Sequence, residues 1–237
     1  MLVVIAILGI LGAALVTNVQ GGYKQARQAN CKSNLRQFGV AITIYRGEHD
    51  NTPPDWISNL YPEYVDNRAM YICRADVNKG RDTLRPPEYV RRIQDSNTLD
   101  ASKFRDNESN GDNTRTKAIE SCSYFYEFSI ANPGWSPESH WPEGDYSTMK
   151  AYKHAQMDYG DVNNPKHIIL PHSAARIPII RCYHHWRDMS LYGVAYAQRS
   201  SWTQSKQPIT LNVAYAGNVF AGPPWWEGTI YPGEARR

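Results

Sequence analysis

The sequence lacks the short motifs that mark common catalytic sites. It contains no GxSxG nucleophile elbow, no HExxH metalloprotease helix, no phosphate-binding loop, and no carboxylate pair that spacing would bring together. The excess of one sign of charge is also small: the chain has 26 Lys and Arg and 23 Asp and Glu, a net charge of +3. So small an excess does not indicate nucleic acid as a partner. We therefore expect a protein that is not an enzyme and needs no cofactor.

Cysteine is scarce as well, with four residues in a chain of 237. They include no CxxC pair and no zinc-finger spacing, so neither a zinc knuckle nor another resident metal is expected. Four cysteines allow three disulfide pairings, and their positions alone do not choose between them. The four are Cys31, Cys73, Cys122 and Cys182.

Polar side chains are missing from the first 16 residues, Met1 to Val16, and the first charged residue is Lys24. As a helix this run covers about 24 Å, a few residues short of a hydrocarbon core of about 30 Å. A signal peptide would carry basic residues before the run. A buried core helix would show a polar face. The run therefore favours a membrane helix that lacks its first few residues.

Beyond the apolar run, apolar residues recur at intervals of four and three, the pattern of one stripe along a helix. We predict a single helix that continues from the run to Arg46, bent near Gly21-Gly22 and capped by Gly47. A membrane anchor that merely precedes a domain helix would give the same pattern. The stripe consists of Cys31, Leu35, Phe38, Ile42 and Tyr45, and the last four are predicted to pack the helix against the rest of the chain.

The remainder of the chain, which we call the head, predicts an α+β fold with a small antiparallel sheet. A helix is expected near Ser147–Asp158, and Gly217-Asn218 is expected to form a hairpin turn. The strand candidates are Met70–Cys73, Ser123–Phe128, Ile177–Tyr183, Thr210–Tyr215 and Val219–Phe220. Residues 77–117 are polar and suit a surface insertion.

One stretch of that insertion, residues 106–117, nearly fits a calcium loop. Lys117 stands where the loop needs a bidentate glutamate, so solvated turns are favoured over a cation site. The weak calcium candidates are Asp106, Glu108, Asn110 and Asp112, with Gly111 at the turn position.

A second group, His172, Cys182, His184 and His185, could hold a transition metal. Strand alternation would send Cys182 and His184 to one face and His185 to the other, so packed or surface histidines are favoured. The stretch PPWWEG at 223–228 could stack on sugar rings or cover the end of the sheet, and the second is favoured.

Two sequence stretches carry a resemblance to a known family. LVVIAILGILGAAL followed by ARQANCKSNLRQFGVAITIYRGEHDNTPP resembles the start of type IV pilin-like and type II secretion pseudopilin-like proteins with an N-terminal methylation motif. Residues 51–76 are similar to the family's proline-bearing segment, short helix and cysteine-containing strand. More weakly, CYHH and TLNVAYAGNVF near the end resemble the histidine and DG-containing signature of one subgroup.

The resemblance implies a filament subunit. Residues 1–23 would be the transmembrane and filament-core half of the helix, and residues 24–237 the amphipathic half plus the head, with 77–120 and 129–170 as insertions. The expected partners are the chain itself, other pilin-like subunits, the membrane before assembly, the inner-membrane assembly machinery and prepilin peptidase. The head would lie outside the cytoplasm. A leader, a cleavage site and the first mature residues are expected upstream of Met1.

A head outside the cytoplasm would favour oxidised cysteines. We expect Cys31–Cys73 and Cys122–Cys182 disulfides, with free buried thiols as the alternative. The alternative function is a membrane-tethered extracytoplasmic binding protein that contacts a glycan through its Trp and Tyr residues.

Overall fold

The computed structural model describes residues 2–81, 113–132, 135–160, 171–185, 190–191, 207–208 and 210–222. Side chains are described throughout these ranges except at 2–20, 190–191 and 207–208.

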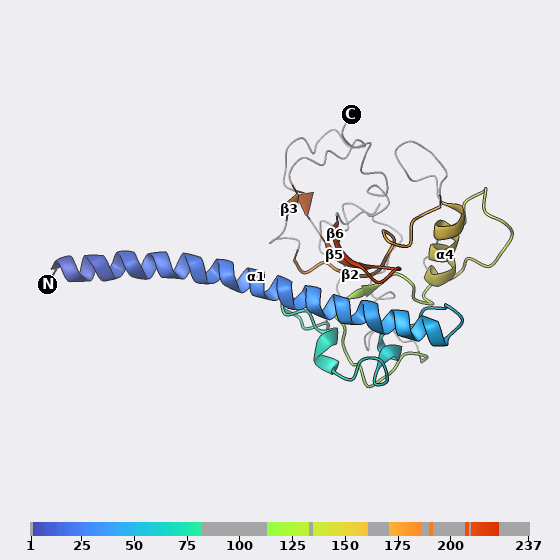
Figure 1. The fold of residues 1–237 in the computed structure, drawn as a ribbon, viewed down its shortest axis with the longest axis horizontal. Helices are drawn as coiled ribbons and strands as arrows, with labels where there is room; N and C mark the ends of the chain where they lie inside the picture. The colour runs from blue at the N-terminus through green and yellow to red at the C-terminus, as the bar shows by residue number, and fades with distance from the viewer. Residues whose placement is uncertain are drawn as a thin grey trace, which may run out of the picture.

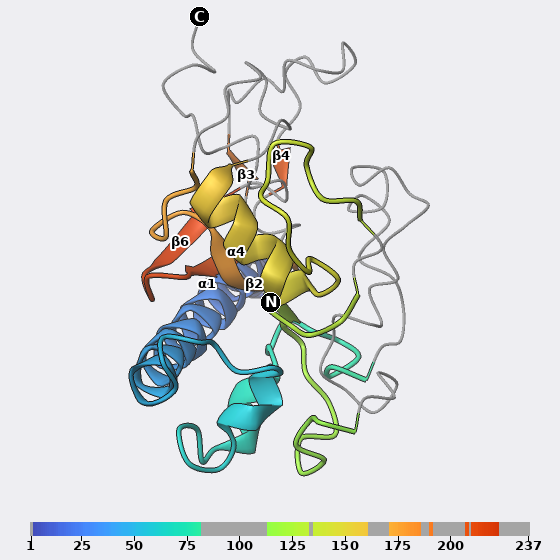
Figure 2. The same cartoon turned by 90° about the vertical axis from the view of Figure 1, so that its right-hand side faces the viewer.

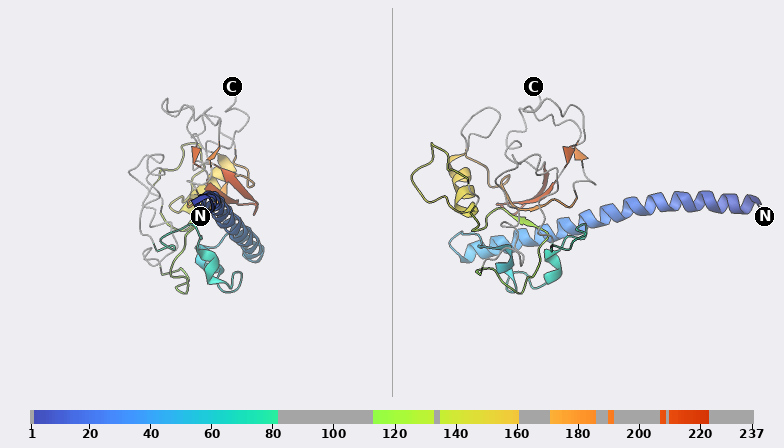
Figure 3. Two further views of the ribbon diagram at one scale, coloured as in Figure 1. Left: turned by 90° about the vertical axis from the view of Figure 1, so that its left-hand side faces the viewer. Right: turned by 180° about the vertical axis from the view of Figure 1, so that it is seen from behind.

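The first element is a long helix, α1, which spans Leu2–Glu48 and has 47 residues, or about 70 Å. Its C-terminal half lies along the head and its N-terminal half projects away from it (Figure 1). The helix is continuous through Gly21 and Gly22 and curves gently (Figure 3). It ends at Glu48, two residues beyond the predicted end at Arg46. Among the helices whose residues are described, none combines the length and the apolar character needed to cross a membrane.

The head contains a four-stranded antiparallel sheet in the order β1-β2-β5-β6. The strands are β1 (Phe125–Tyr126), β2 (Pro178–Cys182), β5 (Thr210–Ala214) and β6 (Val219–Gly222). Two short strands, β3 (Ser190–Leu191) and β4 (Gln207–Pro208), form a separate pair. The protein is therefore α+β, as predicted.

The sheet covers one side of α1, and two 3-10 helices, η1 (Ile57–Leu60) and η2 (Arg68–Tyr71), lie on the other side (Figures 1 and 2). The helix α4 (Met149–Tyr159) lies beside the sheet, near the C-terminal end of α1 (Figure 1). The C-terminal half of α1 is thus enclosed by parts of the head that are distant in sequence.

The predictions for β2, β5, β6 and α4 are confirmed. The α4 helix begins after Thr148, whose Oγ1 accepts a hydrogen bond from Ala151 N at 3.2 Å, and is capped by Gly160 at φ 71°. The candidate Ser123–Phe128 is reduced to the two residues of β1.

The predicted strand Met70–Cys73 is wrong, because η2 occupies its first half. Asn67 begins this helix: its side chain accepts a hydrogen bond from Ala69 N at 3.0 Å, and its carbonyl accepts one from Met70 N at 3.0 Å. Capping of this kind bends the chain into a turn where the apolar run suggested an extended segment.

The predicted stripe of α1 forms the centre of the core. Leu35, Phe38 and Ile42 are at most 1% exposed, whereas Tyr45 is partly buried at the edge. The ring of Phe38 makes edge-to-face contacts with Tyr71 at 5.1 Å and with a second tyrosine, Tyr124, at 5.5 Å. Burial of this stripe joins α1 to both sides of the head.

Two glycines allow α1 to lie very close to the sheet. A Cβ on Gly39 would lie 2.5 Å from the carbonyl oxygen of Gly217, in the turn between β5 and β6. Gly217 has φ +90°, so it adopts a conformation that L side chains rarely take. The predicted hairpin turn is confirmed, and only a helix without a side chain at position 39 can lie this close to it.

A charged residue in the stripe should prevent the head from folding. Leu35→Asp buries an unpaired carboxylate and removes core packing, which costs several kcal/mol, about as much as the whole stability of a marginal domain. Val40→Asp, at a position that is 60% exposed on the same helix, is the matched control. Limited proteolysis of the full chain should find a resistant head only in the wild type and the control. Equal resistance of both variants would contradict the assignment of the stripe to the core.

Two Gly→Ala substitutions in α1 should have opposite effects. At Gly39 the added methyl group meets a backbone oxygen, and overpacking of this kind costs about 1–3 kcal/mol. At Gly47 nothing lies within 4 Å of the added Cβ, so the gain in helix propensity, up to about 1 kcal/mol, is realised. Thermal unfolding followed by circular dichroism should show a lower midpoint for Gly39→Ala and an unchanged or higher one for Gly47→Ala. A raised midpoint for both variants would show that the hairpin turn moves easily to accommodate the methyl group added at position 39.

Candidate functional site at the helix-to-head joint

The polar contacts of α1 with the head are concentrated where the helix enters and leaves it. We call the contact surface of residues 31–46 with the head the helix-to-head joint. At its end, the Arg46 guanidinium lies 3.7 Å from the centroid of the Tyr215 ring and donates to the Tyr215 carbonyl oxygen at 2.7 Å. The Tyr215 hydroxyl donates to Asn51 O at 3.1 Å, just after the helix ends. These contacts fasten the last turn of α1 to the end of β5.

Near the point where the helix enters the head lies a buried amide. Asn34 is 7% exposed, and its Nδ2 donates to the Met70 carbonyl oxygen at 3.2 Å and to the Tyr124 hydroxyl oxygen at 3.2 Å. A buried amide without partners would cost free energy. The position of α1 along its axis is therefore tied to groups from two separate segments of the head.

Where the helix enters the head, four side chains meet that sequence spacing keeps far apart. We call Cys31, Cys73, Cys182 and His185 the thiol cluster. One potential ligand atom from each lies within 4.8 Å of all the others, and all four residues are 0% exposed. The Cys73 Sγ and the His185 Nε2 are 3.3 Å apart.

Hydrogen bonds within the thiol cluster drive the thiol pKa values apart. Hydrogen bonds with Cys182 and then Cys31 lower the pKa of Cys73 far below that of a free thiol, despite its burial. Burial, followed by the hydrogen bonds with the other two thiols, raises the pKa of Cys182. The pKa of Cys31 is also raised, because its hydrogen bond with Cys182, which lowers it, is outweighed by the one with Cys73 and by burial. Within the cluster, the local contacts therefore favour deprotonation at Cys73 and oppose it at Cys31 and Cys182.

All four cysteines are free thiols in the structure, so neither predicted disulfide is present. Cys182 lies with Cys31 and Cys73, whereas Cys122 Sγ donates to the Tyr124 carbonyl oxygen at 3.7 Å. Cys31 and Cys73 do lie together, as the expected pair requires, but the end of β2 brings Cys182 to the same point of α1.

The expected separation of Cys182 from His185 is also wrong. Strand β2 ends at Cys182, and His185 lies in the turn that follows, so strand alternation no longer applies to it. His184 points elsewhere: its Nε2 lies 3.1 Å from Ser123 O and 3.3 Å from a carboxylate oxygen of Asp76. A local signal was available, because Cys182 and His185 form a Cys-x-x-His pair.

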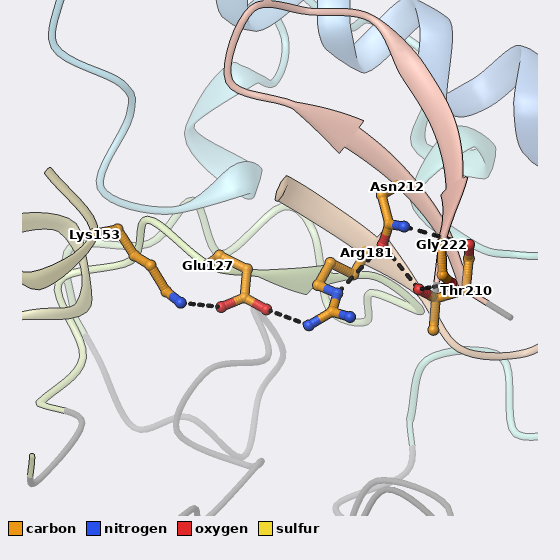
Figure 4. A network of polar contacts seen from close by, with 6 residues as sticks. All are labelled: Glu127, Lys153, Arg181, Thr210, Asn212 and Gly222. Carbon is orange, nitrogen blue, oxygen red and sulfur yellow. Dashed lines mark hydrogen bonds and ion pairs between the residues drawn. The ribbon is translucent and has the colours of Figure 1, made fainter. Parts of the chain in front are cut away.

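A second polar cluster lies on the sheet face opposite to α1 (Figure 4). Glu127 Oε1 accepts from Arg181 Nη1 at 3.1 Å, and its Oε2 is 3.4 Å from Lys153 Nζ. Arg181 Nε also donates to Asn212 Oδ1 at 3.2 Å, and Thr210 Oγ1 lies 3.0 Å from the same oxygen. The three charged residues are at most 4% exposed. This network joins α4 to β2 and β5, and sequence spacing gave no sign of it.

Other sequence candidates fall partly outside the described residues. The calcium candidates Asp106, Glu108, Asn110 and Asp112 and the PPWWEG stretch lie there. His172 is buried and is not part of the thiol cluster. Within the ranges that the structure covers, the thiol cluster is the one group of His, Cys, Asp or Glu side chains arranged to hold a metal ion.

Comparison of the chain with protein-family models, with curated protein sequences and with solved structures gave no match.

The buried carboxylate of Glu127 should matter far more than an exposed one. Glu127→Gln leaves the charges of Lys153 and Arg181 buried without their anion, which should cost about 3–5 kcal/mol. The matched control is Asp55→Asn, since Asp55 pairs with Lys150 while its side chain is 45% exposed; the expected loss is at most about 1 kcal/mol. Urea unfolding followed by tryptophan fluorescence gives both values. Similar small losses would mean that the network contributes no net stability.

Proposed function

We propose that the protein is a structural subunit of a type IV pilus-like or type II secretion pseudopilus filament, and that it polymerises through the N-terminal half of α1. The observation that carries the proposal is the division of one continuous helix. Its C-terminal half is built into the core of the head, while the ribbon of its N-terminal half lies clear of the head (Figure 1). A rod with a head at one end is the shape that a helical filament of pilin-like subunits requires.

The sequence of the projecting half suits a helix that moves from lipid to protein. Met1 to Val16 carries no polar side chain, so transfer from a bilayer to a bundle of identical helices need not expose the rod to water. Gly9 and Ala13 are four positions apart and lie on one helix face. Small residues at this spacing allow two helices to approach closely.

The exposed part of the amphipathic half also supports contacts between subunits. Val40 and Ile44, again four positions apart, are 60% and 50% exposed. In a filament these two residues would face a neighbouring subunit. The proposed partners are therefore other copies of this chain or related subunits, and the membrane, the assembly machinery and prepilin peptidase before assembly.

The tethered glycan-binding alternative gains no support from the described tryptophans. Trp56 is 1% exposed and its Nε1 donates to Thr114 Oγ1 at 3.1 Å. Trp141 is 7% exposed and its Nε1 donates to Gly160 O at 2.7 Å. Trp135 packs against Tyr152 in the same small cluster. Trp56 and Trp141 fill the interior of the head and do not present flat faces to a sugar, and Trp135 is partly buried against the same cluster as Trp141.

Site-specific photocross-linking in cells that produce the chain tests the proposal. A photoreactive amino acid at Ile10 should give a ladder at multiples of the chain's mass, and mechanical shearing should release the cross-linked species from the cells. The matched control carries the same group at Val77, which is 87% exposed in the head and is expected to give no comparable ladder. A chain that cross-links at Ile10 to lipid alone and stays in the membrane after shearing would contradict filament formation.

A further inference from the structure

The thiol cluster offers a complete set of donors for a metal. Three sulfur atoms and one imidazole nitrogen converge from three parts of the fold: α1, the segment after η2, and the end of β2 with its following turn. We propose that Cys31, Cys73, Cys182 and His185 bind one structural Zn²⁺ ion that fastens α1 to the head. The proposal concerns the fold of the head and does not depend on filament formation.

The geometry fits tetrahedral zinc. Zn–S bonds of about 2.3 Å and a Zn–N bond of about 2.0–2.1 Å place the ligand atoms of a tetrahedron roughly 3.5–3.8 Å apart. The four ligand atoms lie within 4.8 Å of one another, and one sulfur–nitrogen pair is at 3.3 Å. Small side-chain rotations therefore suffice to enclose an ion, and no backbone segment has to move far.

The choice of metal follows from the donors. Three thiolates and one imidazole form one of the usual ligand sets of structural zinc, and a closed four-coordinate site leaves no position for a substrate. The hard cations calcium and magnesium prefer oxygen ligands, and the cluster contains none. The site is buried, which matches a structural rather than a catalytic ion.

A disulfide accounts for the cluster less well than zinc does. A bond between any two of the three sulfurs would remove two electrons and two protons and would leave the third thiol and the imidazole buried beside it. Zinc uses all four groups: three thiols release their protons to solvent, three thiolates and the neutral imidazole donate electron pairs, and no oxidant is required.

One unsatisfied atom adds to the case. His185 Nδ1 is buried and has no hydrogen-bond partner among the described residues, while its Nε2 faces the sulfur of Cys73. Packing alone does not explain an imidazole buried in this way, because an orphaned polar atom costs free energy. Only binding of a metal by Nδ1 itself would satisfy this atom.

Zinc would connect parts of the chain that are far apart in sequence. Cys31 and Cys73 are 42 positions apart, and Cys182 follows after another 109. Closing such long loops opposes folding entropically, so an ion that binds only the folded arrangement stabilises it by mass action. It would also add a coordinate link at the entry of α1, opposite to the Arg46 contacts at its exit.

Metal analysis of the full chain, purified in detergent without chelators, tests the proposal. The wild type should contain about one zinc per chain. Cys31→Ser, Cys182→Ser and His185→Ala should each contain less than about a tenth of that amount, since each removes one of the four ligands. Cys122→Ser is the matched control: it removes a buried cysteine from the same core but outside the cluster, and it should retain the ion.

A second measurement on the wild type covers the case in which the ligand variants fail to fold. With zinc bound, denaturation in the presence of a chelator should release the ion and four reactive thiols. Replacement of the zinc by cobalt(II) should give the visible absorption of a tetrahedral thiolate complex. A metal-free wild type, a Cys31–Cys73 disulfide found by peptide mapping, or iron or copper in place of zinc would each overturn the proposal.

Discussion

The fold depends on the burial of one stripe of α1 between two parts of the head. The sheet has four short strands, of which β1 contains two residues and β6 four, so it cannot form a stable layer alone. On the face toward α1, Leu211 and Val213 of β5 are fully buried. On the other side of the helix, Ile57 and Leu60 of η1 are equally buried. Without the helix, both surfaces would be exposed to water, and the head would lack a second layer.

The apolar stripe provides stability, and the polar contacts determine position. Hydrophobic burial is not directional, so the stripe alone would tolerate small shifts of the helix along its axis. The contacts of Asn34, Arg46 and the thiol cluster do not tolerate such shifts, because each group needs specific partners at hydrogen-bonding or bonding distance. The joint thus combines a continuous apolar contact with polar contacts near its entry and at its exit. The Glu127 network, on the other face of the sheet, joins α4 to the same strands.

The sequence predicted those features that depend on local pattern. The stripe of α1, strands β2 and β5, the hairpin turn and α4 all follow from periodicity or turn residues in short stretches of the sequence. Strand Met70–Cys73 was wrong because side-chain capping by Asn67 outweighed an apolar run. The Glu127–Arg181 contact joins residues 54 positions apart, and nothing near either residue indicates its partner.

The thiol cluster, too, depends on contacts between distant residues that local sequence patterns do not predict. Its members come from three segments, and only the pair Cys182 and His185 is local. Strand alternation applies only as far as Cys182, where β2 ends, and the turn that follows brings His185 to the same cluster. Chain topology, which sequence periodicity does not reveal, decides which cysteines meet. The stretches that resemble pilin-like proteins contain all four residues, but the resemblance did not indicate that the four meet.

The contact between Gly39 and Gly217 has a mechanical consequence. The carbonyl oxygen of Gly217 occupies the space that a side chain would take at position 39, and the residues one turn before and after it on the same helix face, Leu35 and Thr43, carry side chains. A slip of the helix by one turn, about 5.4 Å, would drive one of these side chains against the hairpin turn. Tension along the rod would therefore be transmitted to the tip of the β5–β6 hairpin as shear across the sheet. The head would therefore resist axial pulling on α1 by steric contact at the hairpin turn as well as by apolar packing.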